Sequence, residues 1–199
     1  MYHPFLEAVA GELGDRGIAT FRYQFPFMEN GAKRPDPPRL AHATVQAAVA
    51  EAARMLPDVP LIAGGRSFGG RMTSQAQAAS PLPGVRGLAF LAFPLHPAGR
   101  PSTDRATHLG DVHIPTLFLQ GTRDALADTP LLDQIAGRLG ERATLRTLQD
   151  ADHAFHVPAR LGRSDAEVRR EMLDVLTTWI DSVLSSPHYG QPTGSLPSQ

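Results

Sequence analysis

The chain has 199 residues, of which 42% are hydrophobic and 20% charged, and its net charge is −1; these proportions are typical of a soluble globular protein with one sizeable core. A charge this close to neutral argues against a long polyanion such as nucleic acid as partner, and the absence of cysteine excludes disulfides, thiolate zinc sites and a cysteine nucleophile. No apolar run reaches the length of a membrane span and the first residues do not resemble a signal peptide, so we expect a cytoplasmic protein without membrane contact.

The N-terminal part of the chain predicts a helix, a strand, a loop and a second helix. Apolar residues at helical spacing indicate a helix over residues 4–15. The β-branched and aromatic run IATFRYQF predicts a buried strand over residues 18–25. Prolines and a glycine make residues 26–38 a loop, and an apolar stripe marks a long helix over residues 39–56.

Short, continuously apolar strands then alternate with helices. Strands that are apolar on both faces belong in a parallel sheet covered by helices on each side, so we expect an α/β fold in a single domain, residues 1–185. The stretch 95–115 shows no clear element, and the polar tail 186–199 is expected to be flexible. The expected strands are 60–65, 85–94, 116–121 and 143–149. Helices are expected over 66–80 and 129–140, the second with a cap signal at Thr129 and Pro130. A last helix is expected to begin with a capping box formed by Ser164 and Glu167.

Residues 65–69, Gly-Arg-Ser-Phe-Gly, have the G-x-S-x-G spacing of a nucleophile elbow, in which a strand turns sharply into a helix below an exposed serine. We expect glycine at both ends because side chains two residues before and after Ser67 would collide. The backbone N–H of Phe68 is then placed to stabilise an oxyanion. The alternative is a glycine-rich turn that binds a phosphate or only packs tightly, although no lysine follows as in a P-loop.

A nucleophilic serine needs a base and an orienting acid, and two loops that follow predicted strands offer them. Asp124 comes after the strand 116–121, and His153 comes after the strand 143–149. Neighbouring parallel strands bring such loops to one edge of the sheet, so we expect both side chains to lie near Ser67.

Other residues compete for these roles. Asp124 could be an ordinary turn or cap aspartate, with Asp128 as the rival acid; His156 and His96 are the rival bases. Asp150 and Asp152 are expected to shape the loop or cap helices. His153 and His156 have a spacing that could ligate a metal, but a third ligand is missing, so we predict neither a metal nor a cofactor.

The segments PTLFLQGTRD, AGGRSFGGRM and DADHAFH resemble the predicted hydrolases related to the dienelactone hydrolases, and FRYQFPFMENGAKRPDPP is similar to a loop of that family. The likeness runs from about residue 3 to 184. It implies an α/β-hydrolase fold with a mostly parallel sheet and no large cap domain. It also implies nucleophile, acid and base at Ser67, Asp124 and His153. Many dienelactone hydrolases have cysteine as the nucleophile, so the serine here does not imply lactone chemistry.

Members of that family begin with strands that end in a His-Gly-x-Gly loop, which supplies a second oxyanion N–H, whereas this chain starts at the helix. Either translation starts upstream, or the strands read as 18–25 and 60–65 pair directly. We therefore expect a serine hydrolase acting on a small ester, thioester or amide, with a small-molecule substrate as its partner. A non-catalytic α/β-hydrolase-like binding protein and an acyltransferase with the same three residues are the alternatives.

Overall fold

The computed structural model describes residues 3–186 and is built around a four-stranded parallel sheet, in which strands that follow one another in sequence also lie side by side. Every pair of neighbouring strands is parallel, so each connection must cross over a face of the sheet, and helices make these crossovers. The predicted α/β fold class is confirmed. The strands are β1 (Leu61–Arg66), β2 (Val85–Leu91), β3 (Thr116–Gly121) and β4 (Ala143–Leu148).

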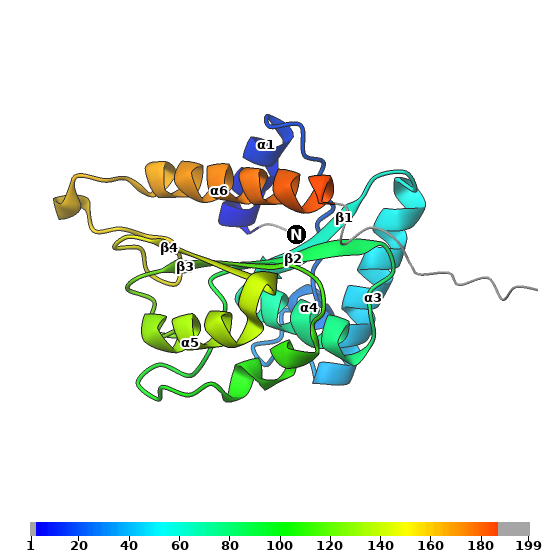
Figure 1. The fold of residues 1–199 in the computed structure, drawn as a ribbon, viewed down its shortest axis with the longest axis horizontal. Helices are drawn as coiled ribbons and strands as arrows, with labels where there is room; N and C mark the ends of the chain where they lie inside the picture. Colours follow the sequence, from blue (N-terminus) through cyan, green and yellow to red (C-terminus); the bar gives the residue numbers. More distant parts are fainter. Residues whose placement is uncertain (1–2, 187–199) are drawn as a thin grey trace, which may run out of the picture.

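Helices cover both faces of the sheet. The first and last helices, α1 and α6, lie on one face, whereas α3, α4 and α5 lie on the other (Figure 1). The α-helices are α1 (Pro4–Gly14), α2 (Pro26–Glu29), α3 (Pro38–Met55), α4 (Phe68–Ala79), α5 (Thr129–Leu139) and α6 (Asp165–Ser185), and the short 3₁₀ helices are η1 (Asp104–Asp111), η2 (Gly140–Arg142) and η3 (Ala159–Leu161).

Two apolar cores, one on each face, explain why the central strands β2 and β3 are mainly apolar. Phe90 and Phe118 point into the core beneath α3, α4 and α5, and their rings pack 5.0 Å apart in a T-shaped pair. The neighbouring Leu117 and Leu119 point the opposite way, into the core that Trp179 of α6 helps to close. Side chains alternate across a strand, so a sheet covered on both faces favours apolar residues on both sides of its strands.

The predicted strand over residues 18–25 is wrong. The structure has neither strand nor helix between α1 and α2, and Phe21 in this segment is 43% exposed. β propensity describes how well a side chain fits a paired, half-buried surface, so a β-prone run without a neighbouring strand stays unpaired. Direct pairing of 18–25 with the strand after it is not observed, because within residues 3–186 β1 pairs only with β2.

Smaller differences concern the ends of elements. The expected loop 26–38 contains α2, the unassigned stretch 95–115 contains η1, and β2 ends at Leu91 rather than near residue 94. The capping box at Ser164 and Glu167 is confirmed. Helix α5 is capped by Asp128, whose carboxylate accepts from the N–H of Leu131, and not by Thr129. The predicted tail lies, apart from Ser186, outside the described residues.

Candidate active site

Ser67 is the single residue that connects the end of β1 to the start of α4. Its φ of 50° and ψ of −118° place it in a conformation that residues other than glycine rarely adopt. Its backbone N–H continues the sheet ladder by donating to the carbonyl of Leu91 at 3.0 Å. The strained turn therefore holds the serine at the carboxyl edge of the sheet, directly at the N-terminus of α4, where the first N–H groups of the helix lack partners within it.

Of the two glycines expected to avoid a collision, only Gly65 is closely confined, since a Cβ there would lie 3.2 Å from backbone atoms of Gly69 and Gly70. A Cβ on Gly69 would make only an ordinary contact, 3.8 Å from the ring of Phe25. A Cβ on Gly70 would instead lie 2.7 Å from the carbonyl oxygen of Gly65, too close for any side chain. The expectation that Gly69 avoids a collision is therefore wrong, and the close helix–strand contact falls one residue later.

Asp124, after β3, has a completely buried side chain that is surrounded by donors. Its Oδ1 accepts from the backbone N–H of Leu126 at 2.8 Å. Its Oδ2 accepts from the side-chain amide of Gln120 and lies 2.7 Å from Nδ1 of His153. A buried carboxylate is tolerated when its oxygens are satisfied in this way. Sequence reasoning missed Gln120, because a glutamine within a strand carries no pattern that marks such a role.

His153 bridges the acid and the serine. Its Nδ1 faces Asp124, and its Nε2 lies 2.8 Å from Oγ of Ser67. Because a carboxylate only accepts hydrogen bonds, Nδ1 carries the imidazole hydrogen and Nε2 presents a lone pair to the serine hydroxyl. The imidazole of His153 is 24% exposed, so water can reach it, whereas the Asp124 side chain is completely buried. The three predicted side chains, Ser67, Asp124 and His153, are thus brought together in one hydrogen-bonded line.

A family model described as "Alpha/beta hydrolase domain" matches residues 1–181. The chain belongs to this family. The solved structures that it resembles have the same fold, but each is less than 25% identical to it. One is an α/β serine hydrolase without a lid from Xanthomonas campestris, 23% identical, which matches over 90% of this chain and 75% of that one with a TM-score of 0.67. Another is an α/β serine hydrolase homologue from Coxiella burnetii, 18% identical over 86% and 76% of the two chains, with a TM-score of 0.68.

A putative α/β hydrolase from Agrobacterium tumefaciens is 19% identical and gives a TM-score of 0.69 over 95% of this chain and 81% of that one. These comparisons support the predicted α/β-hydrolase superfamily. The narrower relation to the dienelactone hydrolases stays a prediction.

In this α/β hydrolase the rival histidines have other partners. His96 is almost fully buried, with Nδ1 3.0 Å from the carbonyl oxygen of Pro97, and its Nε2 accepts from the N–H of Asp128 at 3.0 Å. Both ring nitrogens are thereby used in fixing a loop. His156 is exposed and pairs with Asp165 at the start of α6, which raises the pKa of His156.

The rival and neighbouring aspartates shape the backbone. Asp128 caps α5. Asp152 accepts from the N–H groups of Ala154 and His156 at 2.7 and 3.0 Å and so closes the loop that carries His153. Asp150 adopts a positive φ of 61° at the turn that opens this loop. The expectation that Asp150 and Asp152 shape the loop agrees with these contacts.

Aromatic rings pack beside the elbow. The ring of Phe68, the residue after the serine, meets Phe25 edge to face at 5.1 Å and Phe27 at 5.6 Å. Phe25 and Phe27 come from the end of the unpaired segment 18–25 and from α2. These contacts pack the side chain of Phe68, whose N–H is the expected oxyanion donor, against the end of the unpaired segment.

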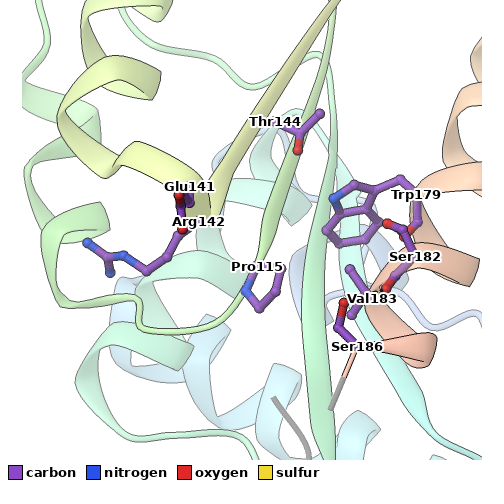
Figure 2. A pocket seen from close by; sticks show the side chains of 8 residues that line it. All are labelled: Pro115, Glu141, Arg142, Thr144, Trp179, Ser182, Val183 and Ser186. Carbon is purple, nitrogen blue, oxygen red and sulfur yellow. Dashed lines mark hydrogen bonds between the residues drawn. The ribbon is translucent and has the colours of Figure 1, made fainter. Parts of the chain in front are cut away.

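One hollow lies far from these residues. It has a volume of about 160 Å³ and is lined by residues that precede or open β3 and β4, such as Pro115 and Thr144, together with Trp179 of α6 (Figure 2). This is the amino edge of the strands, opposite the edge that carries Ser67. Within residues 3–186, no three histidine, aspartate or glutamate side chains gather as a metal site requires, and no helix is long and apolar enough to cross a membrane.

Proposed function

We propose that this α/β hydrolase is a serine hydrolase that cleaves a small carboxylic ester, thioester or amide through an acyl-enzyme. The observation that carries the proposal is the position of the His153 ring, whose Nδ1 lies 2.7 Å from the Asp124 carboxylate and whose Nε2 lies 2.8 Å from the Ser67 hydroxyl. A serine is a weak nucleophile until such a base is placed within hydrogen-bond reach.

Each step of the reaction uses these groups. The Ser67 oxygen attacks the acyl carbon while its proton passes to Nε2 of His153, and the backbone N–H of Phe68 stabilises the oxyanion. The intermediate collapses as His153 returns the proton to the leaving alcohol, thiol or amine. Water then attacks the acyl-enzyme with His153 as base, which releases the acid and restores Ser67. Asp124 holds the imidazole orientation throughout.

The substrate is expected to be compact. The connection between β2 and β3, residues 92–115, contains only the short helix η1, which is too little chain for a large cap over the serine. The site is therefore expected to lie open to solvent. We expect p-nitrophenyl acetate to be cleaved with a higher kcat/KM than esters of long acyl chains; a preference for long chains would overturn this part of the proposal.

A fluorophosphonate probe tests the function. We expect it to label the wild-type protein at Ser67, and Ser67→Ala to remove both the label and the hydrolysis of p-nitrophenyl acetate. Absence of labelling in a folded wild-type protein would contradict the proposal and favour a non-catalytic binding protein. Transfer of the acyl group to an added alcohol or amine, in preference to water, would identify an acyltransferase instead.

A further inference from the structure

We infer that Arg66 is a positioning residue that holds the backbone of His153 in place for its reaction with Ser67. The inference rests on the proposed serine hydrolase function and adds to it a residue that touches neither substrate nor reacting atoms. Arg66 is the last residue of β1 and directly precedes the serine, so its side chain starts from the sheet beside the nucleophile.

The loop that carries His153 needs such a support. Two of its residues, Asp150 and Phe155, adopt a positive φ of 61°, which is unfavourable for side chains other than glycine. The bonds of Asp152 close the loop on itself without fixing it to the strand that carries the serine. Besides the contact between the His153 ring and Ser67, a second hydrogen bond joins the two: Arg66 donates from a guanidinium nitrogen to the carbonyl oxygen of His153 at 3.2 Å.

The start of α1 fixes Arg66 from the other side. The other terminal nitrogen of its guanidinium lies 3.0 Å from Nε2 of His3, and the guanidinium carbon lies 5.6 Å from the centre of the Phe5 ring. Phe5 in turn stacks on Phe155 of the His153 loop, with ring centres 5.4 Å apart and an angle of 13° between the planes. Arg66, Phe5 and the loop thus form a closed set of contacts that restrains the loop from two directions.

The charges around Arg66 agree with this role. Burial lowers the pKa of Arg66, and the carboxylates of Asp152 and Asp124 act against that effect, so the guanidinium keeps its charge. Burial and the nearby Arg66 charge lower the pKa of His3, which therefore offers a neutral nitrogen as acceptor. The Nε of Arg66 is buried without a partner among residues 3–186. An unsatisfied buried donor lowers the stability of the folded protein, so stability alone does not account for an arginine at this position.

The test compares Arg66→Met and Arg66→Lys with Arg169→Met. Arg169 is a matched control because it is also partly buried and joins two elements, with Glu12 of α1 as its hydrogen-bond partner in place of the His153 loop. For each protein, kcat and KM for p-nitrophenyl acetate, the rate of fluorophosphonate labelling and the thermal unfolding midpoint are measured.

We expect Arg66→Met to lower kcat and the labelling rate roughly 30- to 100-fold with KM within about twofold, because a small displacement of a base costs rate rather than binding. Arg66→Lys keeps one donor for the His153 carbonyl and should recover most of the rate, to within about fivefold of wild type. Arg169→Met should lower the unfolding midpoint and leave kcat unchanged.

A wild-type protein that the probe labels, together with a folded Arg66→Met variant labelled as fast as Arg169→Met, would overturn the role of Arg66 and leave the proposed function intact. Equal losses in Arg66→Met and Arg66→Lys would also overturn it, since the lysine retains the donor. A folded wild-type protein that the probe does not label would instead overturn the proposed function together with this inference.

Discussion

Gly121 and Ala151 lie so close together that a Cβ on Gly121 would be 2.2 Å from the carbonyl oxygen of Ala151. Gly121 ends β3 and leads to Asp124, whereas Ala151 leads to His153. The same carbonyl accepts from the N–H of Arg123 at 2.9 Å. The loops of the proposed acid and base are therefore packed backbone against backbone, and this contact sets the separation of Asp124 and His153.

Gly121→Ala should therefore damage both the site and the fold. The added methyl must push the two loops apart, so we expect kcat to fall about 100-fold and the free energy of unfolding to drop by about 1–3 kcal/mol. Gly137→Ala in α5 is the matched control, because a Cβ there meets nothing within 4 Å. It should stabilise the protein by about 0.5–1 kcal/mol without changing kcat. Urea unfolding and ester hydrolysis measure both; an unchanged kcat in folded Gly121→Ala would refute the argument.

Asp124→Asn should leave the fold intact and remove most of the activity. The amide oxygen can still accept from Leu126, but an asparagine that offers its N–H₂ to His153 favours the tautomer with the hydrogen on Nε2, which cannot accept from Ser67. We expect kcat to fall about 10³- to 10⁴-fold. Asp128→Asn is the control, since asparagine caps helices as well as aspartate does. Equal activities of the two variants would remove Asp124 from the mechanism.

The parts of this fold that follow local rules could be read from the sequence. Short strand-like runs, most of them apolar, identified β1 to β4, and the G-x-S-x-G spacing located Ser67, because both depend on neighbours along the chain. The unpaired segment 18–25 could not be identified, since strand formation requires a partner that propensity does not reveal. Neither could the contacts of Gln120, Arg66 and Gly70, which depend on residues that only the folded chain brings near.

Comparing His156 with His153, three residues before it, gives a direct test of which imidazole acts as the base. His156→Ala should keep kcat within about twofold of wild type, because the ring is exposed and its hydrogen-bond partner is Asp165 at the start of α6. His153→Ala should lower kcat by at least about 10³-fold, since no base remains beside Ser67. Both variants are assayed with p-nitrophenyl acetate at the same pH. A large loss in His156→Ala with an intact fold would contradict the assignment of His153.

A third histidine should make stability depend on pH. Burial, followed by the charge of Arg71, lowers the pKa of His108 to about 4 from its ordinary value of 6.5. Its Nε2 lies 2.7 Å from the hydroxyl oxygen of the fully buried Ser74. In the folded protein the ring therefore stays neutral at a pH where the unfolded chain already binds a proton.

Between about pH 6.5 and 4 the unfolded state binds more protons at this site, so stability is full above 6.5 and falls as the pH decreases towards 4. For a partly buried ring we expect a loss of about 1–2 kcal/mol. His108→Gln does not titrate there, so the wild-type free energy of unfolding, measured in urea from pH 4.5 to 8, should fall relative to that of the variant as the pH is lowered. The exposed His113→Gln is the control and should follow the wild type. If the difference between wild type and His108→Gln is the same at every pH, the ring is not held neutral by the fold.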